Sequence, residues 1–290
     1  MSLALGTAQF GMPYGVTNKI KEPTLEELKA ILELARNHGI TLLDTAHSYG
    51  DAELKLGALD LSSFNIVSKL PAIPSEYENI YTNLLSYLEL SLKRLGQNSL
   101  YGLLLHRPDQ LCNPAGGEIY KTLQRFKAAG LIQHFGVSIY SPNELGPILD
   151  VCEPNIVQAP LNVFDQRLIE SGWLDKLVSS NIEIHTRSTF LQGLLLLPRG
   201  YLPTNFKKWS AEFDRWHDCL KKYNISASQA CLAYAQSFQK IEQVIVGVGS
   251  VAQLNEIVAA SLTSLNSNDL EFFKNLSCGD EELINPSKWQ

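Results

Sequence analysis

The feature that most constrains the fold of this chain is a series of short apolar segments that alternates with helix-like segments from end to end. The apolar segments are rich in Val, Ile and Leu, and most of them lack the apolar–polar alternation of a sheet with one wet face. Near-continuous apolar runs are what parallel strands buried on both faces require. We therefore predict eight buried strands, at Leu3–Thr7, Thr41–Asp44, Phe64–Lys69, Leu100–Leu105, Gln133–Ser138, Ile156–Gln158, Ile182–Ser188 and Val244–Gly247.

Helix start and stop signals lie between the predicted strands. Thr24 and Glu27 have the spacing of a capping box, and Gly39 lies where the same helix should end. The same start chemistry recurs at Ser75-x-x-Glu78, Ser141-Pro142-x-Glu144, Ser226-x-x-Gln229 and Ser250-x-x-Gln253.

The strand–helix units follow one another without a linker or a break in composition. This pattern predicts an α/β fold, in the form of a single (β/α)8 barrel domain over residues 1–290. A doubly wound sheet would also alternate, but no G-x-G-x-x-G pattern follows the first strand. Two longer pieces interrupt the rhythm, at about 191–208 and in a C-terminal tail at 262–290. Extensions of this kind usually shape the ligand site of a barrel, and we expect the tail to close over the substrate side.

Composition limits the partners and the compartment. The net charge is -6 and basic residues are scattered, so we expect neither nucleic acid nor an anionic membrane as a partner. The five cysteines form no C-x-x-C pair, and no signal peptide or apolar run of transmembrane length is found. We therefore expect a cytoplasmic protein with reduced thiols, as a monomer or a weak homo-oligomer.

Polar residues end most of the predicted strands, although the strands themselves are apolar. In a barrel, the residues at the C-terminal strand ends point into one shared bowl. Read in chain order, these residues are Thr7, Asp44, Lys69, His106, Ser138, Gln158, Ser188 and Gly247.

Four ionisable groups of this bowl suggest a reaction. A buried Lys69 needs a counter-charge, which Asp44 on the adjacent strand could provide. An ammonium group beside Tyr49 would favour the phenolate, lower the pKa of the phenol and make it a usable proton donor. His106 could hydrogen-bond a carbonyl oxygen and fix its orientation. Together these groups would polarise and protonate a C=O bond while a hydride reaches its carbon.

Each residue alone also has a simpler interpretation. Asp44 could cap the following turn, Lys69 could be a solvated strand end, Tyr49 a rim aromatic and His106 a satisfied turn histidine. Because the four residues lie at or after three successive strands, we expect these simple interpretations to hold for all of them together much less often than for any one alone. His47 and His106 also suggest a metal site, but no third ligand has a recognisable spacing, so we expect no metal.

With these residues in view, the chain resembles the aldo-keto reductase superfamily, and its opening segment 5–15 resembles a bacterial-type branch. The resemblance runs in order from about Leu3 to Ser261 and rests on Asp44-Thr45-Ala46-x-x-Tyr49-Gly50, Val67-Ser68-Lys69, Leu105-His106 and Gly136-Val137-Ser138. Members of this superfamily are (β/α)8 barrels that use an Asp, Tyr, Lys and His tetrad with NADPH or sometimes NADH. The resemblance implies that Tyr49 is the general acid, Lys69 lowers its pKa, Asp44 holds Lys69 and His106 orients the substrate carbonyl.

The resemblance also implies cofactor contacts. Ser138 and Gln158 match residues that bind the nicotinamide carboxamide, although Ile139 stands where the family often has Asn. Arg187 and Ser188 stand in place of a tyrosine that stacks on the nicotinamide in many members. The implied cofactor-binding set is Gly6, Thr7, Ala8, Ser138, Gln158, Arg187, Ser188, Phe190, Leu191, Gly193, Gly247, Gly249, Ser250 and Gln253.

One departure concerns the choice of cofactor. NADPH-preferring members place Lys or Arg in or just after the segment matching Val246–Ser250, to pair with the 2′-phosphate, and this chain has no basic residue there. Ser250 and a helix N-terminus could still bind an anion. NADPH is the cofactor that the family implies, while the loss of a charge-assisted pair makes NADH or dual use an equal expectation.

We therefore predict an enzyme, an NAD(P)-dependent oxidoreductase that reversibly reduces an aldehyde or ketone such as a sugar or another polar carbonyl. Two alternatives stay open. The barrel could be a Schiff-base lyase or aldolase with Lys69 as the nucleophile. It could also bind nucleotide as a sensor without turnover.

Overall fold

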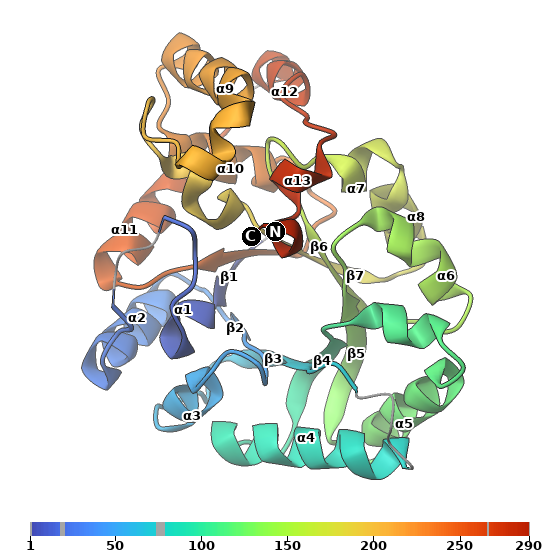
Figure 1. The fold of residues 1–290 in the computed structure, drawn as a ribbon. Helices are drawn as coiled ribbons and strands as arrows, with labels where there is room; N and C mark the ends of the chain where they lie inside the picture. Colours follow the sequence, from blue (N-terminus) through green and yellow to red (C-terminus); the bar gives the residue numbers. More distant parts are fainter. Residues whose placement is uncertain (1, 18–20, 74–78, 266, 290) are drawn as a thin grey trace.

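The computed structural model describes residues 2–17, 21–73, 79–265 and 267–289. At its centre eight strands close into a barrel in chain order, and each strand pairs in parallel with the next (Figure 1). The strands are β1 (Ser2–Gly6), β2 (Leu42–Asp44), β3 (Asn65–Leu70), β4 (Leu100–Leu105), β5 (Ile132–Ser138), β6 (Ile156–Pro160), β7 (Glu183–Arg187) and β8 (Gln243–Gly247). The predicted (β/α)8 barrel is thus confirmed, with strand ends within about two residues of the prediction.

Helices surround the barrel on the outside (Figure 1). They are α1 (Ala8–Gly11), α2 (Leu25–Asn37), α3 (Ala52–Gly57), α4 (Ile80–Leu95), α5 (Gly116–Ala128), α6 (Leu145–Leu149), α7 (Arg167–Glu170), α8 (Trp173–Ser179), α9 (Ser210–Tyr223), α10 (Ala227–Gln236), α11 (Val251–Ala260), α12 (Ser267–Lys274) and α13 (Glu281–Ile284). Short 3-10 turns complete the connections, at η1 (Pro108–Cys112), η2 (Pro142–Glu144), η3 (Leu191–Leu196), η4 (Thr204–Trp209) and η5 (Pro286–Lys288).

Side-chain caps start several helices where the sequence predicted them. Thr24, Ser141 and Ser226 each form a complete capping box, in which both reciprocal hydrogen bonds are present. Ser250 caps α11, but the side chain of Gln253 turns to the backbone N–H of Gly249 instead of that of Ser250. The predicted start at 75–78 lies outside the described residues.

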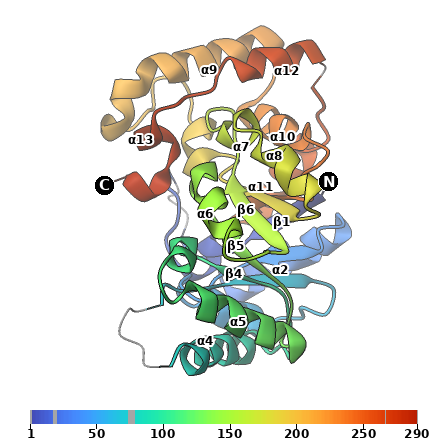
Figure 2. The ribbon, with the colours of Figure 1, turned by 90° about the vertical axis from the view of Figure 1, so that its right-hand side faces the viewer.

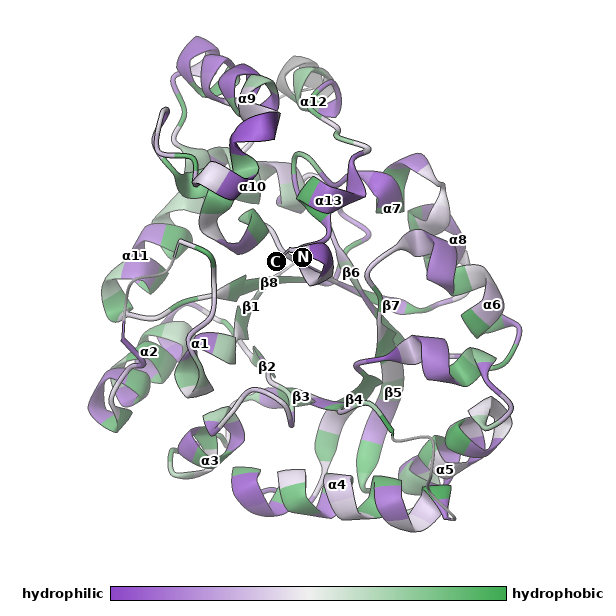
Figure 3. Cartoon of the chain, viewed as in Figure 1, coloured by the Kyte–Doolittle hydropathy of each residue, from purple (hydrophilic) through white to green (hydrophobic). Residues whose placement is uncertain are grey.

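The apolar side chains form two layers. A small cluster fills the interior of the barrel, and a much larger one lies between the strands and the helices. Leu104 points inward while Leu103 and Leu105 belong to the outer layer, the alternation that a strand buried on both faces requires. In Figure 3 the strands at the centre are mostly green, whereas the surrounding helices carry both green and purple residues.

The insertion after β7 and the C-terminal tail pack against each other. Helices α9 and α12 lie side by side (Figure 2), and the rings of Tyr223 and Phe272 are 5.6 Å apart. Further along the tail, the backbone N–H of Cys278 donates to the Phe164 carbonyl after β6 at 2.8 Å. The tail therefore lies over loops that follow the C-terminal strand ends. In the described part of the chain, no helix is long and apolar enough to cross a membrane.

Candidate active site

Three consecutive strands bring the predicted catalytic residues together. Asp44 ends β2, Lys69 lies one residue before the end of β3, His106 directly follows β4, and Tyr49 lies in the turn after β2. The Lys69 ammonium donates to Asp44 Oδ2 at 2.7 Å, to the Thr45 carbonyl at 2.9 Å and to Tyr49 Oη at 3.4 Å. The side chains of Lys69 and Asp44 are only 1% and 6% exposed, so their ion pair is almost fully removed from water.

A close backbone approach fixes the turn that carries Tyr49. A Cβ on Gly11 would lie 2.1 Å from the Tyr49 carbonyl oxygen, and a Cβ on Gly50 would lie 2.0 Å from the Gly11 carbonyl oxygen. Gly50 also has a φ of +58°, which glycine adopts without strain. As a result the Lys69 Nζ lies 5.0 Å from the centre of the Tyr49 ring, and the His106 ring meets that ring edge-on at 6.0 Å.

His106 is a neutral imidazole in this site. Burial first, and then the charges of Lys69 and Arg187, lower the pKa of His106 to about 4. Its Nδ1 lies 3.2 Å from Ser48 Oγ. When Nδ1 accepts the Ser48 hydroxyl hydrogen, Nε2 carries the ring proton and can donate it to a substrate oxygen.

Burial is the largest influence on the pKa values of Tyr49 and Lys69. Burial, followed by the charge of Asp44, raises the pKa of Tyr49 far above its ordinary value. The lowering of the Tyr49 pKa that was expected from Lys69 therefore does not prevail, because burial and the charge of Asp44 outweigh it. Burial also lowers the pKa of Lys69, and Asp44 opposes this. The phenol consequently keeps its proton throughout the physiological pH range.

A second hydrogen-bond chain holds Asp44 from the other side of the barrel. Gln158 Nε2 donates to Asp44 Oδ1 at 2.7 Å, and Ser138 Oγ donates to Gln158 Oε1 at 3.2 Å. Both side chains are buried. Ser138 and Gln158, which were expected to contact the cofactor, thus orient Asp44 in this structure and do not line the cavity described next.

A cavity of about 450 Å³ opens beside Tyr49 and Asp44, a size typical of small-molecule sites. It extends between β1, β7 and β8 to the first turns of α11. Nine of the predicted cofactor residues line it, namely Gly6, Thr7, Ala8, Arg187, Ser188, Phe190, Gly193, Gly247 and Gln253.

The remaining predicted cofactor residues have local structural roles. Leu191 is fully buried, in a turn where it, Gln192 and Gly193 all have positive φ. Gly249 donates its N–H to Gln253, and the hydroxyl of Ser250 accepts from the backbone of Gln253 at the start of α11. These contacts keep Leu191, Gly249 and Ser250 out of the cavity lining.

Sequence reasoning missed several residues of the cavity. Glu256 lies one helical turn after Gln253 on the same face of α11, and this i, i+3 spacing could have found it. Ser228, whose hydroxyl donates to Glu256 at 3.1 Å, carries no signal in the sequence. The other unpredicted lining residues include Gln9, Gly15, Thr17, Thr189 and Gln192.

Two polar atoms of the lining fit a polar ligand. Gln9 Oε1 and Thr189 Oγ1 are buried and have no hydrogen-bond partner within the described structure, and such atoms are rare in folded proteins. A Cβ on Gly247 would lie 2.6 Å from Gln9 Nε2, so a side chain at position 247 would displace this amide. A Cβ on Gly193 would lie 2.0 Å from Thr17 Oγ1, which shows how closely the loops after β1 and β7 approach. The lining therefore fits a long polar molecule such as a dinucleotide.

No group of three or more His, Cys, Asp or Glu residues that could hold a metal ion occurs within the described ranges.

Comparison with known proteins agrees with this geometry. Residues 2–277 match the aldo/keto reductase family. The chain is 26% identical to L-glyceraldehyde 3-phosphate reductase of Escherichia coli O157:H7, over 81% of this chain and 79% of that protein. It is 28% identical to an oxidoreductase of Bacillus subtilis over 59% of this chain, a match that covers only 56% of that relative.

The fold has a solved counterpart in the holo form of an aldo-keto reductase from Bacillus halodurans. The TM-score is 0.77, with 19% identity over 99% of this chain and 95% of that one. The chain therefore belongs to the aldo/keto reductase family and is an NAD(P)-dependent oxidoreductase.

Proposed function

We propose that this protein reversibly reduces an aldehyde or ketone, with a sugar or another polar carbonyl as substrate and Tyr49 as the general acid. The observation that carries this proposal is the position of Lys69, between Asp44 Oδ2 at 2.7 Å and Tyr49 Oη at 3.4 Å. Tyr49 also lines the cavity, so its hydroxyl can reach a bound substrate.

The roles of the four side chains follow from their environments. The neutral His106 donates a hydrogen bond to the carbonyl oxygen and orients it. When bound, the nicotinamide supplies a hydride to the carbonyl carbon. Tyr49 keeps its proton while the carbonyl is neutral and gives it up once the oxygen becomes a strongly basic alkoxide. Lys69, held by Asp44, then lies beside the phenolate and stabilises its charge.

The cavity lining supports a nicotinamide dinucleotide as the cofactor, either NADPH, as the family implies, or NADH. Gly6, Thr7 and Ala8 on one side and Ser188, Phe190 and Gly193 on the other would hold the dinucleotide. At the α11 end the lining residues Gln253 and Glu256 include no cation. A 2′-phosphate at this end would lack a charge-assisted partner, which removes the main reason for a strong preference for NADPH.

The lyase interpretation has one observation in its favour, the lowered pKa of Lys69. A Schiff base, however, needs the amine to reach a substrate carbonyl. Lys69 is 1% exposed, is enclosed by Asp44, Thr45 and Tyr49, and does not line the cavity. The reductase interpretation therefore accounts for the site better.

The experiment that tests the proposal compares Tyr49→Phe with wild type in the reduction of a panel of polar aldehydes. We expect kcat to fall about 100- to 10,000-fold, as for loss of a general acid, while NADPH binding is retained. Tyr101→Phe is the matched control, because it removes a tyrosine hydroxyl at the opposite end of the barrel, where that hydroxyl donates to Glu183. A Tyr49→Phe variant as fast as wild type would show that another group donates the proton.

A further inference from the structure

Arg187 lines the cavity near Tyr49 and forms no direct ion pair with a carboxylate of the described residues; Asp165, on whose pKa the charge of Arg187 acts, is itself paired with Arg167. Other arginines of the chain form ion pairs, such as Arg107 with Asp109 and Arg167 with Asp165. Among the residues that the structure describes, no Asp or Glu oxygen pairs with the Arg187 guanidinium. A half-buried charge without a counter-ion is costly, and a ligand anion would offset that cost.

The guanidinium is held in place by three contacts. Nη2 donates to the Ile139 carbonyl at 2.9 Å, Nη1 donates to Ser188 Oγ at 3.2 Å, and the group stacks on the Tyr140 ring at 4.6 Å from its centre. These contacts use only part of its five N–H donors. The group is thus positioned before any ligand arrives, which lowers the entropy cost of binding.

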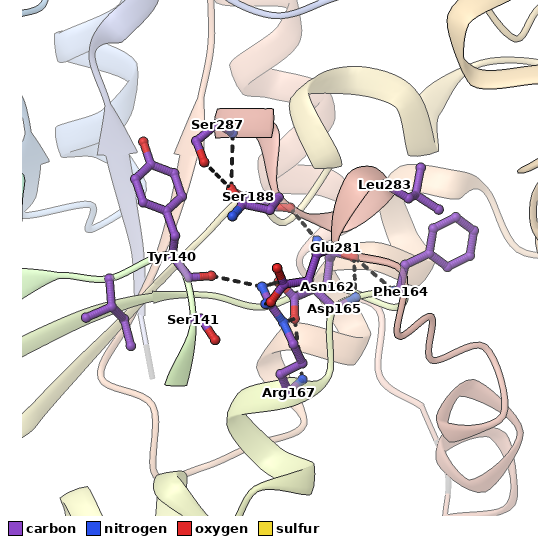
Figure 4. A network of polar contacts seen from close by, with 12 residues as sticks. Tyr140, Ser141, Asn162, Phe164, Asp165, Arg167, Ser188, Glu281, Leu283 and Ser287 are labelled. Atoms are coloured by element: carbon purple, nitrogen blue, oxygen red, sulfur yellow. Dashed lines mark hydrogen bonds and ion pairs between the residues drawn. The ribbon is translucent and has the colours of Figure 1, made fainter. Parts of the chain in front are cut away.

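The backbone of Tyr140 is anchored in turn by a partly buried ion-pair network (Figure 4). Its carbonyl accepts from Arg167 Nη2 at 2.9 Å, and the same guanidinium pairs with Asp165 at 2.8 Å and with Glu281 of the tail at 3.3 Å. Asp165 is fully buried. The platform on which Arg187 stacks is therefore tied to both the loop after β6 and α13.

The remaining groups at this end of the cavity contribute no net charge. Asp44 and Lys69 neutralise each other, and His106, Tyr14 and Tyr49 are neutral around pH 7. Arg187 faces all of these groups, and its charge lowers the pKa values of Lys69 and His106. Among these described groups, Arg187 is thus the one whose charge no direct ion pair offsets, whereas Glu256 makes the α11 end acidic.

From these contacts we infer that Arg187 determines substrate class, by binding a carboxylate or phosphate carried by the carbonyl substrate. A planar guanidinium fork matches both groups in two-point hydrogen bonding. This inference rests on the proposed reductase function. Arg187 contacts substrate in this scheme, while Tyr140 and Arg167 position it.

The test uses two aldehydes of nearly equal shape, 4-carboxybenzaldehyde and methyl 4-formylbenzoate, with NADPH. Wild type should prefer the carboxylate at least about tenfold in kcat/KM, equivalent to about 1.4 kcal/mol. Arg187→Met should abolish this preference, and Arg187→Lys should retain part of it because it keeps the charge. Arg125→Met is the matched control, since Arg125 also stacks on a tyrosine, Tyr81 at 3.7 Å, but lies on the exposed face of α5. Arg125→Met should keep the full preference.

Three results would overturn the inference. Wild type could show no preference for the carboxylate, or Arg187→Met could keep it. Arg187→Met could also weaken NADPH and NADH binding equally while the preference survives, which would make a cofactor phosphate the anion that Arg187 binds.

A binding measurement separates this inference from the proposed function. Benzoate and benzamide are titrated by calorimetry into NADPH-loaded wild type and into NADPH-loaded Arg187→Met. Tighter binding of benzoate that is lost in Arg187→Met supports the inference even if no aldehyde is turned over, in which case only the proposed reaction fails. Equal binding of benzoate and benzamide to wild type overturns the inference whether or not aldehydes are reduced.

Discussion

The buried pair of Asp44 and Lys69 should show strong energetic coupling. Lys69→Met leaves the Asp44 carboxylate buried, with Gln158 as its remaining side-chain partner. Asp44→Asn keeps an acceptor for Gln158 but turns an NH2 group towards the Lys69 ammonium. Each single change leaves an uncompensated charge that is almost fully buried, and we expect it to lower the free energy of unfolding by about 3–5 kcal/mol.

The double variant removes both charges at once. The groups that are then left without a hydrogen-bond partner are neutral, and leaving them unpaired costs about 1–3 kcal/mol. The double variant should therefore be no less stable than either single variant. Its loss of unfolding free energy should be smaller than the sum of the two single losses by about 3 kcal/mol or more.

Urea unfolding followed by tryptophan fluorescence measures these differences, and Lys240 with Asp175 provides a matched control. This pair is also Lys–Asp at 2.7 Å, but its side chains are 53% and 74% exposed. Changes to Met and Asn there should add within about 0.5 kcal/mol. Additive effects at Asp44 and Lys69 as well would refute the reasoning, because they would mean that water screens the two charges from each other.

Two further predictions concern His106 and the network around Arg167. The pKa of His106 in the folded protein, about 4, lies below the value of about 6.5 for an unfolded histidine. His106 should therefore contribute its full stabilisation above about pH 6.5 and lose it as the pH falls towards 4. An NMR titration of the histidine ring signals of wild type, with the signal missing from His106→Gln as the assignment, should show the low pKa. Urea unfolding at several pH values should show a flatter stability profile in His106→Gln than in wild type. Arg167→Met leaves the buried Asp165 unpaired and should lower the free energy of unfolding in urea by about 3 kcal/mol. Glu281→Gln should lower it by less than about 1 kcal/mol, because the Glu281 side chain is 42% exposed. Equal costs for these two variants would mean that Asp165 is not the residue that makes Arg167 important.

The barrel was predictable because its signal is local. Each strand is a short apolar run, as in Leu103–Leu105, and caps such as Thr24 need only residues three positions away. The proximity of Asp44 to Lys69 was predictable for a related reason, since adjacent parallel strands end at the same face of the barrel.

Other parts of the site depend on contacts that no local pattern encodes. The hydrogen bond from Gln158 to Asp44 spans 114 positions and crosses the barrel, so no local pattern predicts it. Leu191 was included among the cofactor contacts because of its place in the chain, but the run of positive φ angles after β7 turns it into the core. The raised pKa of Tyr49 arises from the extent of burial, which sequence spacing does not determine.

The most direct test of the account is a fluorescence titration of the wild-type protein with NADPH and NADH in parallel, read as energy transfer from tryptophan to the bound nicotinamide. The cavity beside Tyr49 predicts saturable micromolar binding of both cofactors, with affinities that differ little because no basic side chain among the described residues lines its α11 end. Failure of both to bind at millimolar concentration would contradict the assignment of this cavity to a nicotinamide cofactor.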